Sequence, residues 1–172
     1  MSYSTIPKRL QDFASKWVPG LKTYLQREGL RDADKLIRDE LVERLDKVRK
    51  ALDKAKARRV DRGSLKNLDK LDRATRKIEK VRDTIKYDSR GYRGVFDPEE
   101  VAENQLAALI DFDTRLFEFV DVLDQEVEKV VSLADDQLQD ALYEFEEKVE
   151  GLHSTLGERE QYSTGNLPQP QK

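Results

Sequence analysis

Cysteine is absent from this 172-residue chain, and histidine occurs once. The lack of cysteine excludes disulfide scaffolds, thiol catalysis and cysteine-ligated metal sites. A single histidine argues against a histidine-based zinc site and against a histidine-rich active site. We therefore expect a protein that holds no metal and no cofactor.

Long apolar runs are also missing. No stretch approaches the ~18 consecutive apolar residues of a membrane-spanning helix. The N-terminal MSYSTIPKRLQDF lacks the apolar run of a secretory signal. Together these features predict a cytoplasmic location.

Glycine and proline are sparse, and their placement outlines the fold. Neither occurs in three long windows, between Gly29 and Gly63, between Gly63 and Gly91, and between Pro98 and Gly151. Leu, Lys, Glu, Arg and Ala dominate these windows, a composition that favours helices. No window alternates with a period of two residues, so we expect no strand.

Apolar residues recur every three or four positions in each window, which places one apolar stripe along each helix. The stripe of the first window comprises Leu41, Leu45, Val48, Leu52 and Ala55. We predict long helices near 31–61, 65–88, 98–131 and 135–156, and shorter ones near 6–18 and 20–28. Ser64 and Asp97 are predicted helix caps, and Ser132 with Asp135 predicts a break.

The expected fold class is all-α, an elongated antiparallel helical bundle with a coiled-coil-like hairpin and no strands. Residues 1–29 are expected to form short amphipathic helices, and residues 157–172 a disordered tail. The bundle between them, residues 30–156, divides into a basic hairpin (30–90) and acidic helices (97–156).

The formal net charge of −3 hides a strong asymmetry along the chain. Residues 1–93 contain 27 Lys and Arg against 15 Asp and Glu, whereas residues 94–172 contain 5 against 20. The basic residues are densest at the tip of the predicted hairpin, around Gly63. They are Lys54, Lys56, Arg58, Arg59, Arg62 and Lys66.

Two explanations of this asymmetry compete, and a solvated run of charge with no partner is a third possibility. In the first, basic helices lie beside acidic ones, and the halves attract each other through exposed pairs that contribute about 0–1 kcal/mol each. In the second, the hairpin tip binds a polyanion or an acidic partner, because acids of the same chain would not reach it. Sequence-specific DNA recognition is not expected, since no zinc-finger spacing, RNA-binding aromatic strand or helix-turn-helix is recognisable.

The link from Lys86 to Pro98 combines glycine with aromatic and basic residues. Arg90, Tyr92 and Arg93 are candidates to stack on a base or to grip an acidic partner. The alternative is a connector that folds onto the end of the bundle.

The segment from Ile6 to Leu25 is basic and amphipathic. Leu10, Phe13 and Trp17 are candidates for a helix that lies in a membrane interface or binds a partner. The alternative is a helix that closes one end of the bundle, with Trp17 in the core.

Asp113 interrupts the apolar stripe of the third long helix. A buried carboxylate needs a partner, and we expect Arg or Lys from the basic hairpin. Such a residue usually fixes helix register rather than carrying chemistry. Glu150 and His153 share the Glu-x-x-His spacing of helical di-iron proteins, but those sites require two such motifs. We therefore assign no catalytic and no metal-binding residue.

The sequence thus predicts a non-enzymatic helical adaptor, scaffold or assembly subunit that acts through helix–helix and charge-complementary contacts with a protein partner or with itself. No small-molecule substrate is expected. One alternative is a peripheral protein that assembles on anionic membranes through its basic N-terminal half. The order of a basic amphipathic segment, a basic hairpin and acidic helices is similar to that of ESCRT-III and PspA-like proteins, in architecture alone. A further alternative is non-specific nucleic-acid binding by the hairpin tip.

Overall fold

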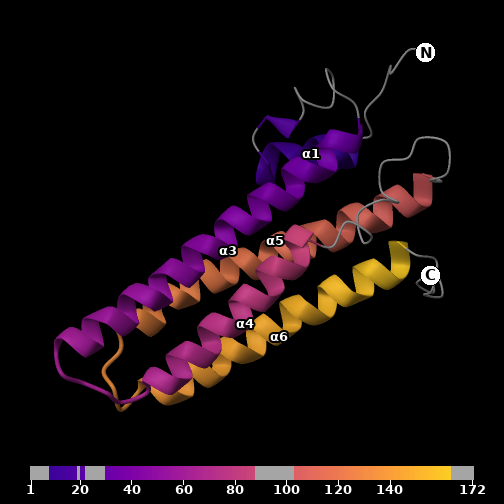
Figure 1. The fold of residues 1–172 in the computed structure, drawn as a ribbon. Coiled ribbons are helices and arrows are strands. Elements are labelled where there is room, and N and C mark those ends of the chain that lie inside the picture. The colour runs from indigo at the N-terminus through magenta and orange to yellow at the C-terminus, as the bar shows by residue number, and fades with distance from the viewer. Residues whose placement is uncertain (1–7, 19, 22–29, 88–102, 164–172) are drawn as a thin grey trace. The chain divides into compact units, whose positions relative to one another are not determined.

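The computed structural model describes residues 8–18, 20–21, 30–87 and 103–163 (Figure 1). They form α1 (Lys8–Trp17), α3 (Leu30–Asp61), α4 (Leu68–Tyr87), α5 (Glu103–Ser132) and α6 (Leu138–Ser163). No strand occurs among the residues described. The predicted all-α class, with helices packed in pairs, is confirmed.

The chain divides into two compact units, and α3, α5 and α6 each contribute to both. The first unit comprises Met1–Glu40, Asp88–Phe117 and Thr155–Lys172. The second comprises Leu41–Tyr87 and Glu118–Ser154. Each unit has its own buried apolar core.

In the first unit, α1 packs on α5 around one phenylalanine. The fully buried ring of Phe117 meets Phe13 edge-on, with centroids 5.6 Å apart, and stacks on Trp17 at 5.5 Å. Leu10 is buried on the same face of α1. Because an isolated helix of ten residues is marginal in water, this buried face is what stabilises α1.

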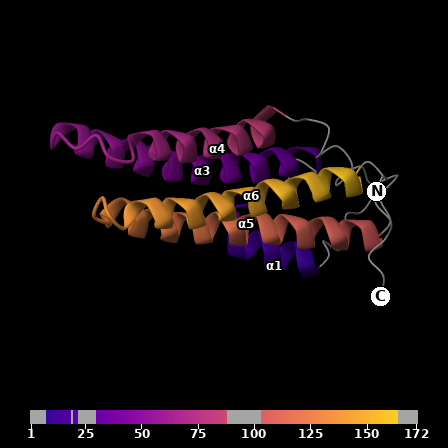
Figure 2. The same ribbon diagram turned by 90° about the horizontal axis from the view of Figure 1, so that it is seen from below.

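In the second unit, α3 and α4 form an antiparallel hairpin that packs with α5 and α6. Figure 2 shows α3 beside α4 and α5 beside α6. The apolar stripes read from the sequence form the core. Its fully buried side chains include Leu45, Val48, Leu52, Leu71, Ile78, Leu123, Leu142 and Phe145.

Ion pairs fix the order of the four helices around this second core. One short pair joins each two neighbours. It is Lys56–Asp72 between α3 and α4 (2.5 Å), Arg44–Asp121 between α3 and α5 (2.8 Å), Arg73–Glu146 between α4 and α6 (2.9 Å) and, between α5 and α6, Lys148–Glu126 (3.2 Å). The order around the core is therefore α3, α4, α6, α5. It follows that α3 and α6 occupy diagonally opposite corners of the second unit.

The turns between the long helices differ in part from the prediction. The break expected near Ser132 is confirmed, because α5 ends there. Ser64, in contrast, does not cap α4, which begins four residues later; its hydroxyl donates to Asp135 at 2.5 Å. Gly63 (φ 72°) and Asn67 (φ 60°) have left-handed backbone, which suits these residue types and delays the start of the helix.

The predicted end of the last helix at residue 156 is wrong. α6 continues through Gly157 to Ser163. Burial of Leu156 and Arg159 outweighs the ~1 kcal/mol that a glycine costs inside a helix. The predicted disordered tail is therefore helical as far as residue 163. Its remainder lies outside the described residues, as do most of the short helix predicted near 20–28 and the cap at Asp97.

Candidate functional site: a basic groove between α3 and α5

The apolar stripe of α3 divides the charged residues of that helix between two flanks, one toward α4 and one toward α5. On the α4 flank, Arg49 bonds Asp46 at 3.4 Å and Asp53 at 2.8 Å, and Arg82 of α4 bonds Asp46 at 2.9 Å. Burial opposes ionisation of Asp46, but hydrogen bonds from Arg82 and Arg49 outweigh it and lower the pKa of that carboxyl. This flank therefore neutralises its own charges.

Acidic residues of α6 neutralise further cations of the hairpin. Glu146 is buried and accepts from Arg73 at 2.9 Å and from Lys77 at 3.1 Å. Lys77 also bonds Glu150 at 2.8 Å, and the two carboxylates, Glu150 foremost, raise the pKa of Lys77. In the second unit, basic and acidic parts of one chain thus lie against each other, as the first explanation of the charge asymmetry requires.

The predicted cluster at the hairpin tip separates into paired and unpaired residues. Arg59 is buried, with Nε 3.1 Å from Oδ1 of Asp135, and it donates from Nη2 to the carbonyl of Leu133 at 3.0 Å. Lys56 bonds Asp72 of α4. The expectation that acids of the same chain do not reach the tip is therefore wrong for Arg59, because the loop between α5 and α6 brings Asp135 there.

Asp135 joins this loop to the tip through several contacts. Its backbone carbonyl accepts from the side-chain amide of Asn67 at 2.8 Å. The hydrogen bond from Ser64, followed by that from Arg59, lowers the pKa of the Asp135 carboxyl, and the charge of Lys66 adds to the effect. Arg59 therefore contributes to the structure of the tip.

The other residues of the predicted cluster are exposed, and no residue in the described part of the chain pairs with them. They are Lys54, Arg58, Arg62 and Lys66. Lys50, outside the predicted cluster, is also exposed and has no partner among the described residues. Lys47 has only a 3.9 Å contact with Glu43, and both side chains are exposed. Since residues 47, 50, 54 and 58 recur every three or four positions, they form one basic strip along α3.

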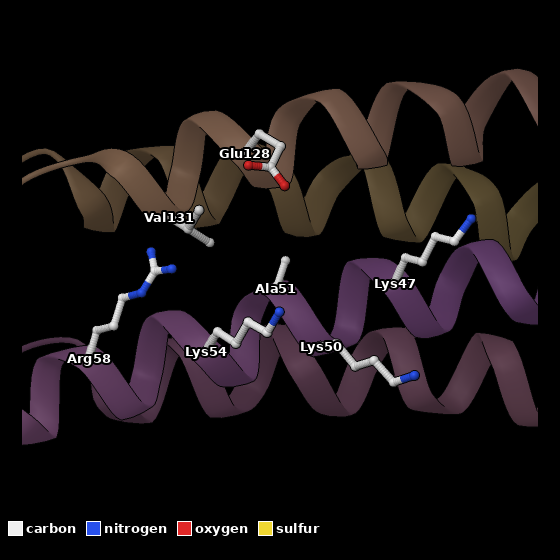
Figure 3. A pocket seen from close by; sticks show the side chains of 7 residues that line it. All are labelled: Lys47, Lys50, Ala51, Lys54, Arg58, Glu128 and Val131. Atoms are coloured by element: carbon white, nitrogen blue, oxygen red, sulfur yellow. The ribbon is translucent and has the colours of Figure 1, made fainter.

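This basic strip borders a groove of about 310 Å³ between α3 and α5 (Figure 3). Ala51 and Val131 are half-buried and form its apolar floor, while Arg58 and Glu128 point into it from opposite helices. Lys50 lies at the outer rim, away from α5. The basic groove therefore combines an apolar floor with a cationic rim and a single carboxylate.

A second hollow, of about 430 Å³, shares Arg58 and Val131 with the basic groove and extends it to Arg62. Charge density along the sequence singled out Lys54, Arg58 and Arg62 but not Lys47 or Lys50. The sequence signal that could have revealed this strip is the four-residue spacing of residues 50, 54 and 58, because it places them on one face of a helix.

The remaining predicted site residues do not join this groove. Arg90, Tyr92 and Arg93 lie outside the described residues. Leu10, Phe13 and Trp17 are buried in the first unit, the last two on Phe117, which matches the core interpretation of that segment.

Asp113 is buried in the first unit, as predicted, but its expected partner is wrong. The ion partner is Arg159 of α6, with Nε 2.6 Å from Oδ1, and not a cation of the basic hairpin. Arg159 is one of only five cations in residues 94–172. The charge asymmetry therefore directed the prediction to the basic hairpin instead.

The described part of the chain shows neither a metal-binding cluster nor a membrane-spanning helix. It contains no group of three His, Asp or Glu side chains that could hold a metal ion, and Glu150 is engaged by Lys77. No helix among the same residues is long and apolar enough to cross a membrane.

Comparison of the chain with protein-family models, curated proteins and solved structures found no match.

Proposed function

We propose that this protein is a non-enzymatic adaptor or assembly subunit that binds an acidic protein surface in its basic groove. The observation that carries this proposal is the contrast between the cations at the α3–α4 contact and those of the basic strip. Cations toward α4 are matched by carboxylates at 2.8–3.4 Å, whereas Lys50, Lys54 and Arg58 have no partner in the described chain.

The unmatched cations hold no other described residue in place through a hydrogen bond or an ion pair. Lys47 to Arg58 spans about 16 Å of helix at 1.5 Å per residue, and like charges along such a strip repel one another. The apolar side chains beneath them, Ala51 and Val131, are only half-buried. A partner that supplies carboxylates and one apolar side chain would relieve the repulsion and cover the floor of the groove.

The composition of the groove favours a protein over a phosphate-bearing ligand. Glu128 points into the groove and would repel any anion beside it, so an occupant must place an uncharged part of its surface there. The apolar floor gives no advantage to a phosphate. A helix that carries both carboxylates and apolar residues can instead use the rim and the floor together.

The proposal is tested by the affinity of the full chain for a fluorescent helical peptide whose glutamates follow one face around a single tyrosine. Fluorescence anisotropy should show binding that weakens as salt rises, because the Debye length falls from ~10 Å at 0.1 M to ~3 Å at 1 M. Reversal of the groove by Lys50→Glu, Lys54→Glu and Arg58→Glu should weaken binding at least tenfold. That factor corresponds to about 1.4 kcal/mol, a modest sum for three pairs.

The matched control places the same charge change on α4, at three exposed cations. The control variant carries Arg76→Glu, Lys80→Glu and Lys86→Glu. It should bind the peptide within about threefold of the wild type. Equal losses in the two variants would contradict a specific groove. Tighter binding of duplex DNA or of vesicles containing phosphatidylserine, lost on groove reversal, would favour the polyanion alternatives.

A further inference from the structure

The second unit carries another unmatched strip of charge, on α6. Asp140, Glu144 and Glu147 are exposed, and no residue in the described ranges pairs with them. Their spacing of four and three residues places them on one face of the helix. Tyr143 lies beside them with 61% of its surface exposed. We call these four residues the acidic strip.

The acidic strip complements the basic groove in charge, length and apolar content. From Asp140 to Glu147 it extends about 10 Å along α6, within the ~16 Å from Lys47 to Arg58. The groove volume of about 310 Å³ equals roughly ten water molecules at ~30 Å³ each, room enough for the ring of Tyr143. The ring would lie over the apolar floor while the carboxylates meet the cationic rim.

These two surfaces do not meet within the second unit of one molecule. α3 and α6 occupy diagonally opposite corners of that unit, and the basic strip and the acidic strip consist of residues exposed at those corners. A single partner copy therefore does not fill both surfaces at once. Contact between copies leaves one groove and one strip available for the next molecule.

We infer that the basic groove of one copy receives the acidic strip of a second copy of this chain. This inference rests on the proposed function and deepens it by naming the partner. The contact is head-to-tail, so successive copies either close into a ring or extend as a filament. Because both surfaces are charged and exposed, the assembly forms at low salt and dissociates at high salt.

Sedimentation velocity of the full chain at about 0.1 M and 1 M salt tests the inference. The wild type should form species larger than a dimer at low salt and sediment as a single chain at high salt. Two variants should sediment as single chains at both salt concentrations. One is groove reversal (Lys50→Glu, Lys54→Glu, Arg58→Glu), and the other is strip reversal (Asp140→Lys, Glu144→Lys, Glu147→Lys).

Mixing the two variants supplies the sharpest result. The reversed groove of one variant then faces the reversed strip of the other, and the two unaltered surfaces also face each other, so the mixture should assemble as the wild type does. Circular dichroism should show unchanged helical content in both variants. Should strip reversal disturb folding, Asp140→Asn with Glu144→Gln and Glu147→Gln should still weaken wild-type assembly.

Three outcomes would overturn self-assembly: a wild type that sediments as a single chain under all conditions, an assembly that survives either reversal, or a mixture that stays unassembled. The peptide experiment separates this failure from that of the proposed function. If the groove binds the acidic peptide while the wild type remains a single chain, the partner is a different acidic protein. If neither binding nor assembly occurs, both proposals fail.

Discussion

Arg159 of α6 and Asp113 of α5 form an ion pair with 2.6 Å between Nε and Oδ1, and their side chains are only 1% and 2% exposed. Burial raises the pKa of Asp113, while the charge and hydrogen bond of Arg159 act in the opposite direction. Any other register of α5 against α6 would leave a buried charge without its partner, at a large cost. The pair therefore fixes which faces of the two helices meet in the first unit.

The buried pair predicts an asymmetry between single and double substitution. Asp113→Leu removes the carboxylate that the buried Arg159 guanidinium bonds and should lower the free energy of unfolding by about 3–5 kcal/mol. Adding Arg159→Met removes the buried guanidinium as well and should restore stability to within about 1 kcal/mol of the wild type or above it. Urea denaturation measures both. Additive losses in the double variant would show that the pair is not coupled.

Two adjacent arginines at the hairpin tip provide a matched comparison. Arg59→Met removes the bonds to Asp135 and to the carbonyl of Leu133 and should cost about 1–3 kcal/mol. Arg58→Met alters an exposed, unpaired side chain and should change stability by less than about 0.5 kcal/mol. Equal effects in urea denaturation would contradict the assignment of Arg59 to the structure and Arg58 to the groove.

The two helical glycines of α6 should respond differently to alanine. Nothing lies within 4 Å of a Cβ at Gly157, so Gly157→Ala should raise the free energy of unfolding by about 1 kcal/mol. A Cβ at Gly151 would lie 2.9 Å from Cε1 of Phe119, so Gly151→Ala should gain less or lose stability. Thermal unfolding of the two variants side by side is the measurement. Equal gains would refute the close approach of Phe119 to α6.

Acidification should destabilise the second unit. Hydrogen bonds from Lys148 and Lys129 lower the pKa of Glu126, and that from Lys77 lowers the pKa of Glu150, in each case from 4.5. A carboxyl whose folded pKa is lowered gives stability that is complete above the unfolded value and is lost as the pH falls through the folded value.

The free energy of unfolding should therefore fall between about pH 5 and pH 3. In the first unit, the raised pKa of Asp113 acts in the opposite direction. Glu126→Gln should flatten the slope for the whole chain, as followed by the urea midpoint at each pH. A midpoint that rises on acidification would mean that the raised pKa of Asp113 dominates.

Much of the fold could be predicted because its causes are local. The apolar stripe from Leu41 to Ala55 follows the helical period, and all five of its residues are buried. The prediction ended the last helix before Gly157. It was wrong because the burial of Leu156 and Arg159, which keeps α6 helical there, depends on helices distant in sequence. The partner of Asp113 could not be read from spacing for the same reason.

The candidate site could be predicted only in part. Arg59 follows Leu52 by seven residues and Ala55 by four, in phase with the buried stripe, and this spacing alone distinguishes it from Arg58. That Asp135 reaches the tip depends on the loop between α5 and α6, which lies 76 residues further along the chain. Lys50 becomes recognisable as part of a groove only once Val131 of α5 is placed beside α3.

The central claim, that the basic groove binds an acidic protein surface, is tested most directly by NMR titration of the ¹⁵N-labelled full chain with the acidic helical peptide. The largest amide shifts should fall on residues 47–58 of α3 and 128–131 of α5, and should disappear in the groove-reversal variant. Amides of α4 should not move. Shifts centred on α4, or shifts that persist after groove reversal, would contradict the account.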